Sequence, residues 1–190
     1  MPTPIPYGAW PSPLTAALVA SGARGITDVV VDERAVYWGE TRPDEGGRVT
    51  IMRCAFGRLG AEGGAVELLP APWNARTRVH EYGGAAFTVA GGTVYFSNFA
   101  DQRLYRLPVA AGEGDRGDHG GDTGDGARRA APEPLTPAGP WRYADAVLDG
   151  ARRRLVRARG RSPEAADGTG QPRNEVVAID LATGEARVLS

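Results

Sequence analysis

The chain has 190 residues, 42% of them hydrophobic, which suffices for the core of one ordinary domain and argues against a wholly disordered protein. Its 22 basic residues are all arginines and stand against 23 acidic residues, so the formal charge of −1 favours neither nucleic acid nor an anionic membrane as a partner. A single cysteine, Cys54, excludes an internal disulfide framework. With only two histidines beside it, the chain has few ligands for a structural zinc site.

The N-terminal arm, residues 1–24, has no apolar run of the length that a signal peptide needs. No stretch of the chain approaches the ~20 consecutive apolar residues that span a bilayer, so we expect no membrane partner and a cytoplasmic location. Helix-forming residues are concentrated at 14–20, and Gly22 and Gly25 limit them to about one turn.

Beyond the arm, strand-like segments rich in Val, Tyr, Phe and Ile recur in three units of four. The segments of the first unit are Ile26–Asp32, Ala35–Trp38, Val49–Cys54 and Ala65–Leu69. Those of the second unit are Ala85–Val89, Thr93–Ser97, Arg103–Pro108 and Glu133–Thr136. Those of the third unit are Ala144–Leu148, Arg153–Ala158, Asn174–Asp180 and Glu185–Leu189.

The spacing of these segments predicts an all-β fold. The second segment of each unit begins at Ala35, Thr93 or Arg153, so the repeat is 58 to 60 residues long. Four antiparallel strands at such a period are typical of a β-propeller blade, although kelch and related blades are usually shorter, at about 40 to 50 residues. We predict a partial β-propeller over 25–190, with blades at about 25–72, 78–139 and 140–190.

Three blades are too few to close a ring, since propellers have roughly four to eight. A blade buries its faces against its neighbours, so the first and third blades would each leave one apolar face uncovered. We therefore expect the chain to be the N-terminal portion of a longer protein. Its open blade edges also make an oligomer possible.

Two segments interrupt the blades with compositions typical of flexible, solvated loops. One is the insert 111–131, with seven glycines and four aspartates, and the other is 160–172. The aspartates of the insert lack the layout of an EF-hand and of the nonapeptide calcium repeat. We expect no metal and no cofactor.

Nucleophilic catalysis has no support in the motifs. The string nearest to a G-x-S-x-G elbow is 160–164, where Glu164 replaces the second glycine, and it lies in a predicted loop. We expect no catalytic residue in this chain. The arginine-rich run 151–161 alternates along a predicted strand and favours a charged blade surface over a nucleic-acid patch.

The densest group of functional side chains lies at residues 76–84. His80 and Glu81 are adjacent, but Gly84 stands where a helical zinc motif needs a second histidine. Tyr82 can pack with its hydroxyl bonded, and Gly83 with Gly84 allows a crowded inner strand near the propeller axis. Because inner strands also line the channel, ligand contact stays an open alternative to this structural role.

Three strings carry a resemblance to a known family: 7–13 (YGAWPSP), 78–84 (RVHEYGG), and 94–98 (VYFSN) followed by 101–105 (DQRLY). They resemble the N-terminal propeller of the prolyl oligopeptidase family, most closely its bacterial dipeptidyl aminopeptidase or acylaminoacyl-peptidase-like branch. The resemblance implies a propeller placed over a C-terminal α/β-hydrolase domain, which holds a Ser-Asp-His triad and cleaves short or N-terminally blocked peptides. That domain is absent from this sequence.

From this resemblance we expect the chain to admit and position peptides and to be inactive on its own. Arg78, His80, Glu81 and Arg103 lie in the matching strings and are the candidate substrate-binding residues. An interaction module that completes a ring with another chain is the alternative. A propeller enzyme acting on sugars or lactones through a metal would rest on fold analogy alone.

Overall fold

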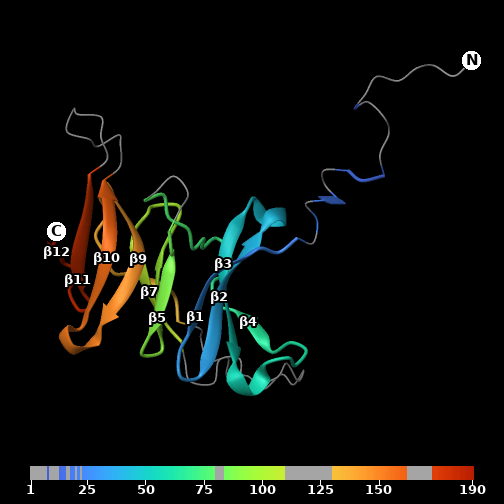
Figure 1. The fold of residues 1–190 in the computed structure, drawn as a ribbon, viewed down its shortest axis with the longest axis horizontal. Helices are drawn as coiled ribbons and strands as arrows, with labels where there is room; N and C mark the ends of the chain where they lie inside the picture. Colours follow the sequence, from blue (N-terminus) through green and yellow to red (C-terminus); the bar gives the residue numbers. More distant parts are fainter. Residues whose placement is uncertain are drawn as a thin grey trace, which may run out of the picture.

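The computed structural model describes residues 8, 13–15, 18–19, 21, 23–79, 84–109, 130–161 and 173–190 (Figure 1). Most of the predicted insert 111–131 lies outside these residues, as do 162–172 of the second predicted loop. The helical turn expected at 14–20 is present in part, since the Val19 amide donates to the Thr15 carbonyl at 3.0 Å. No helix among the described residues is long and apolar enough to cross a membrane.

The described strands form three four-stranded antiparallel sheets, each in chain order from first to last strand. The first sheet contains β1 (Ile26–Val31), β2 (Ala35–Arg42), β3 (Arg48–Ala55) and β4 (Ala65–Glu67). The second contains β5 (Phe87–Ala90), β6 (Thr93–Ser97), β7 (Leu104–Pro108) and β8 (Glu133–Pro134). The third contains β9 (Trp141–Asp149), β10 (Arg154–Arg161), β11 (Asn174–Asp180) and β12 (Ala186–Val188). Short 3₁₀ turns are η1 (Pro43–Glu45), η2 (Phe56–Arg58) and η3 (Gly150–Arg152).

The sheets stand side by side in chain order, with the second between the first and the third (Figure 1). Their first strands are neighbours, because β1 contacts β5 and β5 contacts β9. These strands are therefore the inner strands of three successive blades. The chain is an incomplete β-propeller with an open ring, which confirms the predicted fold class.

Two apolar cores join the blades, and period-2 alternation explains both. Tyr37 and Ile51 of the first sheet pack with Phe96 of the second in one core. Leu155 and Val177 of the third sheet pack in the other core, with Tyr95 of the second sheet. The middle sheet thus contributes alternate residues, Tyr95 and Phe96, to opposite faces. Both of its faces are covered, as a blade inside a propeller requires.

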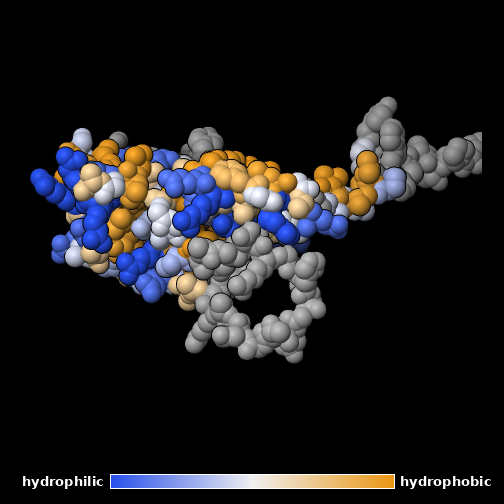
Figure 2. Space-filling model, turned by 90° about the horizontal axis from the view of Figure 1, so that it is seen from below, coloured by the Kyte–Doolittle hydropathy of each residue, from blue (hydrophilic) through white to orange (hydrophobic). Residues whose placement is uncertain are grey.

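The outer faces of the first and third sheets expose several large apolar side chains, although Met52 and Cys54 of β3 are buried. Val29 and Val31 of β1 alternate with Val30, which packs into the first core, and they are 61% and 60% exposed. Val147 and Val176 lie on the outer face of the third sheet and are 68% and 43% exposed. Figure 2 shows apolar surface among charged groups toward the end of the molecule formed by the third sheet.

The prediction that the arginine-rich run 151–161 forms a charged surface is partly wrong. Arg157 and Arg159 of β10 are 1% and 9% exposed and face the second sheet, on the same side of the strand as Leu155. Arg159 pairs with Glu175 of β11, and its guanidinium carbon lies 3.7 Å from the centre of the Trp141 ring. A buried partner thus compensates Arg159, which charge alternation alone could not reveal.

Candidate functional site

An open cleft of about 1020 Å³ lies where the first two blades meet the start of the third. Inner strands β1 and β9 supply Asp28 and Arg142, and the chain approaching β5 supplies Arg76 and Arg78. Phe99, from the turn between β6 and β7, also lines it. We call this site the arginine cleft. Among the described residues three guanidinium groups and one carboxylate line it, so this part of its wall is positively charged.

The two exposed arginines reach the cleft because buried and exposed residues alternate along 75–78. Ala75 and Thr77 are buried, so the intervening Arg76 and Arg78 point outward. Their guanidinium carbons lie 4.7 and 4.0 Å from the centre of the Phe99 ring, within the range of cation–π attraction. Stacking on a fixed ring reduces the conformations that the arginine side chains must give up on binding a ligand.

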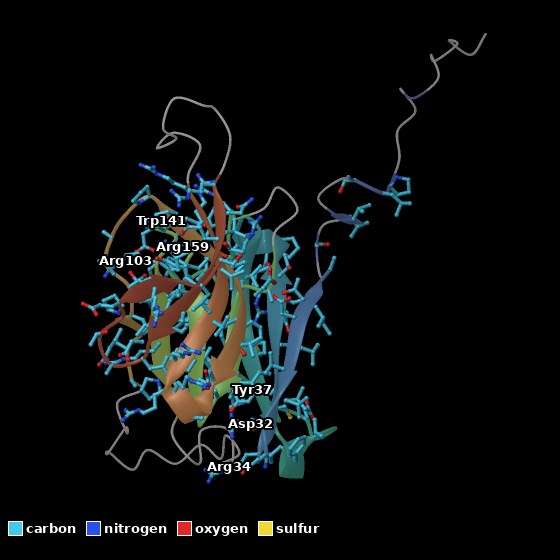
Figure 3. The ribbon with its side chains drawn as sticks, turned by 60° about the vertical axis from the view of Figure 1, so that its left-hand side comes forward. Asp32, Arg34, Tyr37, Arg103, Trp141 and Arg159 are labelled. Atoms are coloured by element: carbon cyan, nitrogen blue, oxygen red, sulfur yellow. The ribbon has the colours of Figure 1, made fainter. Side chains whose placement is uncertain are left out.

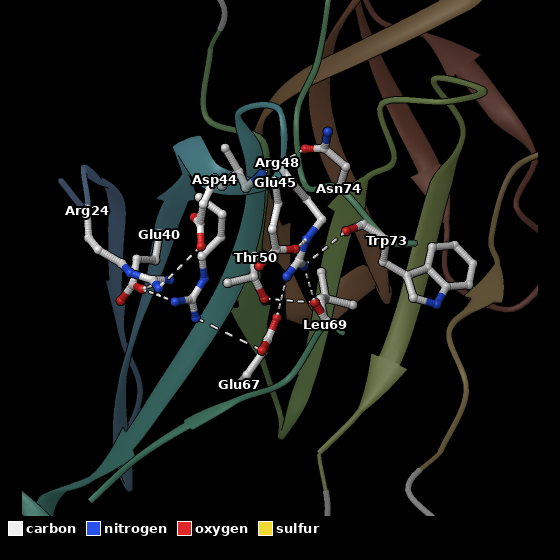
Figure 4. A network of polar contacts seen from close by, with 12 residues as sticks. Arg24, Glu40, Asp44, Glu45, Arg48, Thr50, Glu67, Leu69, Trp73 and Asn74 are labelled. Carbon is white, nitrogen blue, oxygen red and sulfur yellow. Dashed lines mark hydrogen bonds and ion pairs between the residues drawn. The ribbon is translucent and has the colours of Figure 1, made fainter. Parts of the chain in front are cut away.

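A buried arginine fixes the chain that precedes this segment (Figure 4). Arg48, 8% exposed, donates to the carbonyls of Leu69 at 2.7 Å and Trp73 at 3.3 Å, and it pairs with Glu67 at 2.8 Å. The hydrogen bond with Glu45, opposed by burial, raises the pKa of Arg48 above its ordinary value. The Arg48 side chain therefore holds residues 69–73 beside the start of β3.

The turn that carries Phe99 is held by its own polar side chains. The Gln102 side chain donates to the Phe99 carbonyl at 2.9 Å and accepts from the Arg78 amide at 2.8 Å. Gln102 has a φ of 58°, and the Asn98 side chain donates to Asp101 at 3.0 Å. Residues 98–103 therefore form a fixed turn, in which the Gln102 side chain links the backbones of Phe99 and Arg78.

Two aspartates tie the inner strands together at the cleft. The Ala86 amide donates to Asp28 at 3.1 Å, and the Ala85 amide donates to Asp145 at 2.9 Å. Both aspartates have positive φ, 37° and 54°, where the registers of β1 and β9 shift. The bulges turn both side chains toward the backbone that leads into β5 of the second blade. Their carboxylates are thus already engaged by backbone amides.

Arg157 lies behind the same wall. It is 1% exposed and donates to the carbonyls of Ala144 at 3.4 Å and Ala85 at 3.5 Å. Its Nη1 has no hydrogen-bond partner in the part of the chain that the structure describes. Burial, opposed by the charge of Asp145, lowers the pKa of Arg157 to about 10. At neutral pH this guanidinium is still charged and adds to the positive potential of the cleft.

The predicted site residues do not all lie together. Arg78 lines the arginine cleft, whereas His80 and Glu81 lie outside the described residues. Arg103 lines a separate cavity of about 420 Å³ between the second and third blades, with Trp141 and Arg159 (Figure 3). Its Nε donates to the Thr136 carbonyl at 2.8 Å.

Sequence reasoning missed Arg76, Phe99 and Arg142 as neighbours of Arg78. The alternation of arginines at 76 and 78 was a usable signal, since an extended segment places both on one side. Arg142 gave no local signal, because blade packing brings it to Arg78, whose carbonyl accepts from it at 3.2 Å. The crowding expected at Gly83 and Gly84 is found at Gly84, where a Cβ atom would lie 2.9 Å from the Cβ of Ala144, but Gly84 precedes the inner strand β5 and Gly83 lies outside the described residues.

The chemistry of the cleft suits binding of an anion. Its described side chains supply cationic donors and an aromatic surface. Among the described residues no three His, Cys, Asp or Glu side chains gather in a group that could hold a metal ion.

Comparison with known proteins shows similarity to solved peptidase structures. No protein-family model and no curated protein sequence matches the chain. A puromycin-hydrolyzing peptidase of Mycobacterium tuberculosis is 37% identical over 97% of this chain, with a TM-score of 0.70. Puromycin hydrolase is 33% identical over 98% of this chain, with a TM-score of 0.71. A chain of a nidogen/laminin complex, 14% identical with a TM-score of 0.52, shares the fold alone.

The similarity covers nearly all of this chain but only 27% of the length of either peptidase. The part of this chain that the structure describes comprises three open blades. This chain therefore belongs to the prolyl oligopeptidase family, in which it corresponds to a portion of the N-terminal β-propeller.

Proposed function

We propose that this chain admits and positions peptides for a serine peptidase that acts on short or N-terminally blocked peptides. Hydrolysis belongs to a separate α/β-hydrolase domain. The observation that carries the proposal is the 33–37% identity with puromycin-hydrolyzing peptidases over 97–98% of this chain. The chain spans about a quarter of those peptidases, 27%, which suits a part that assists catalysis.

The geometry of the arginine cleft supports a positioning role. Its volume, about 1020 Å³, is comparable to that of sites that hold small ligands. Its walls come from the inner strands of successive blades, so a bound peptide would lie near the propeller axis. The side chains available there bind and orient a ligand, which is the contribution that proximity makes to catalysis.

Activity measurements on the purified 190-residue chain test the division of labour. We expect aminoacyl and N-acyl-peptide p-nitroanilides to be hydrolysed at the buffer rate. Calorimetry with N-acetylated tripeptides should nevertheless detect binding. Turnover that a serine-directed inhibitor abolishes would contradict the proposal, and so would a complete lack of peptide binding.

The uncovered outer faces favour a second role, in which another β-sheet packs against this chain. Val29 and Val31 at one end and Val147 and Val176 at the other are all more than 40% exposed, on strands that also contribute to the apolar cores. Such faces are typical of surfaces that need a partner. The partner would be a further blade, either in a longer chain or in another molecule.

A further inference from the structure

We propose that the arginine cleft binds the carboxylate of a peptide through Arg78 and Arg142, with Phe99 as the apolar surface beside it. The inference rests on the proposed function for the class of ligand, a short peptide. It goes further by naming the group that is recognised. The site lies at the junction of the blades, apart from the cavity that Arg103 lines.

The exposed arginines Arg76 and Arg78 keep hydrogen-bond donors that a ligand could use. The Arg78 guanidinium stacks on Phe99 and forms no ion pair with a described carboxylate. The Arg76 guanidinium also stacks on Phe99, and it donates to the Gly47 carbonyl at 3.3 Å. A guanidinium has five N–H donors, so both groups keep donors that can face a ligand. Their planar geometry suits a two-point contact with a carboxylate.

The buried guanidinium of Arg157 lies behind the wall of the arginine cleft. Arg157 touches the Ala85 carbonyl, and Ala85 lines the cleft. Its Nη1 has no hydrogen-bond partner among the described residues, and no described carboxylate forms an ion pair with it. Since a buried charge is poorly screened, this guanidinium raises the positive potential at the cleft. An anion there would compensate this charge further than the nearby Asp145 does.

Two aspartates near the cleft favour a carboxylate over a more highly charged anion. Asp28 lines the cleft, and Asp145 lies next to it, where a Cβ atom on Gly84 would meet the Asp145 carboxylate at 3.2 Å. These two negative charges reduce the net positive charge and disfavour a phosphate. Phe99 offers an apolar surface for a neighbouring side chain of the ligand. A singly charged group attached to an apolar residue fits best.

Calorimetry on the full 190-residue chain with three probes tests this site. The probes are N-acetyl-Ala-Ala-Ala as its free acid, the same peptide as its C-terminal amide, and N-acetyl-Ala-Glu-Ala amide. We expect the free acid to bind about tenfold more tightly than the amide, since charge-assisted hydrogen bonds are the strong ones. The glutamate peptide distinguishes the source, because it binds like the acid if any carboxylate serves and like the amide if only the terminus does.

Single substitutions identify the residues. Arg78→Gln and Arg142→Gln should each remove the preference for the acid, and added NaCl should weaken it. Arg34→Gln is the matched control, because Arg34 lies in the turn between β1 and β2, at the end of β1 opposite to Thr27 and the cleft. Circular dichroism checks folding. If Arg142→Gln unfolds, Arg78→Gln decides, since the Arg78 side chain is exposed.

Equal binding of acid and amide would overturn the carboxylate site and leave peptide positioning intact. Equal acid preference in wild type and Arg78→Gln would overturn the assignment of the residues. If none of the three peptides binds, the proposed function fails together with this inference.

Discussion

Asp32 shows how one side chain fixes a turn between strands. Its carboxylate accepts from the amides of Arg34 and Ala35, both at 2.8 Å, and from the Tyr37 hydroxyl at 3.0 Å (Figure 3). Burial opposes ionisation, but these bonds and the charge of Arg53 outweigh it and lower the pKa of Asp32. The ionised form therefore stabilises the β1–β2 hairpin.

We predict that Asp32→Asn lowers the free energy of unfolding by about 1 kcal/mol at pH 7, the scale of hydrogen bonds to a partly exposed charged group. Because the folded pKa is lowered, the contribution is complete above the unfolded pKa of about 3.9 and is lost as the pH falls through the folded value. Urea unfolding at several pH values should show the two proteins converging in acid. Asp44→Asn, whose side chain is 62% exposed, is the control and should change little. A difference that persists unchanged in strong acid would contradict this explanation.

At the scale of elements, the turn after β11 packs against the preceding blade. Asp180 accepts from the amides of Ala182 and Thr183, and these bonds lower the pKa of Asp180. The turn ends at Gly184, which has a φ of 72°. A Cβ atom there would lie 1.7 Å from the Leu135 carbonyl oxygen, so the backbones of two blades meet at this glycine. Only glycine fits both the conformation and the space.

We predict that Gly184→Ala destabilises the protein by about 3 kcal/mol or more, the sum of a strained φ and a backbone displacement. Gly91→Ala is the matched control, since Gly91 also has a positive φ, 54°, but no described atom lies within 4 Å of the added Cβ. That control should cost only about 1 kcal/mol. Thermal and urea unfolding of both variants measure the difference. Equal losses would show that the contact between blades does not matter.

At the scale of the whole molecule, the open ring leaves two apolar faces that other blades would cover. Val29, Val30 and Val31 of β1 are consecutive apolar residues, a pattern typical of a strand that is buried on both faces. Exposed faces of this kind drive association between copies of a chain. The same surfaces therefore decide whether the chain is stable as a monomer.

We predict that the 190-residue chain self-associates as its concentration rises, as measured by light scattering. Val31→Lys places a charge on the outer face of the first sheet and should shift the chain toward the monomer. Leu59→Lys, at a residue 55% exposed in the loop before β4, should not. A folded wild-type monomer at all concentrations would contradict both this prediction and the second proposed role.

Local pattern was sufficient to predict the blades. Glycine and aspartate turns between alternating apolar segments placed β6 at Thr93–Ser97 and β11 at Asn174–Asp180, with the predicted bounds. The uncovered faces also followed from the number of units. Neighbouring strands in a blade are close in sequence, so short-range signals are enough to order them. The string at 78–84 additionally carried the family resemblance that the solved peptidases confirm.

The arginine cleft could not be derived in this way, because it joins residues of three blades. Arg142 meets Arg78 across 64 positions of sequence, and Arg157 reaches Ala85 across 72. The sequence by itself therefore determined the strands, their grouping into blades and the open ring. Only the tertiary structure decided which arginines are buried and which gather at the cleft, because their surroundings depend on how separate blades pack.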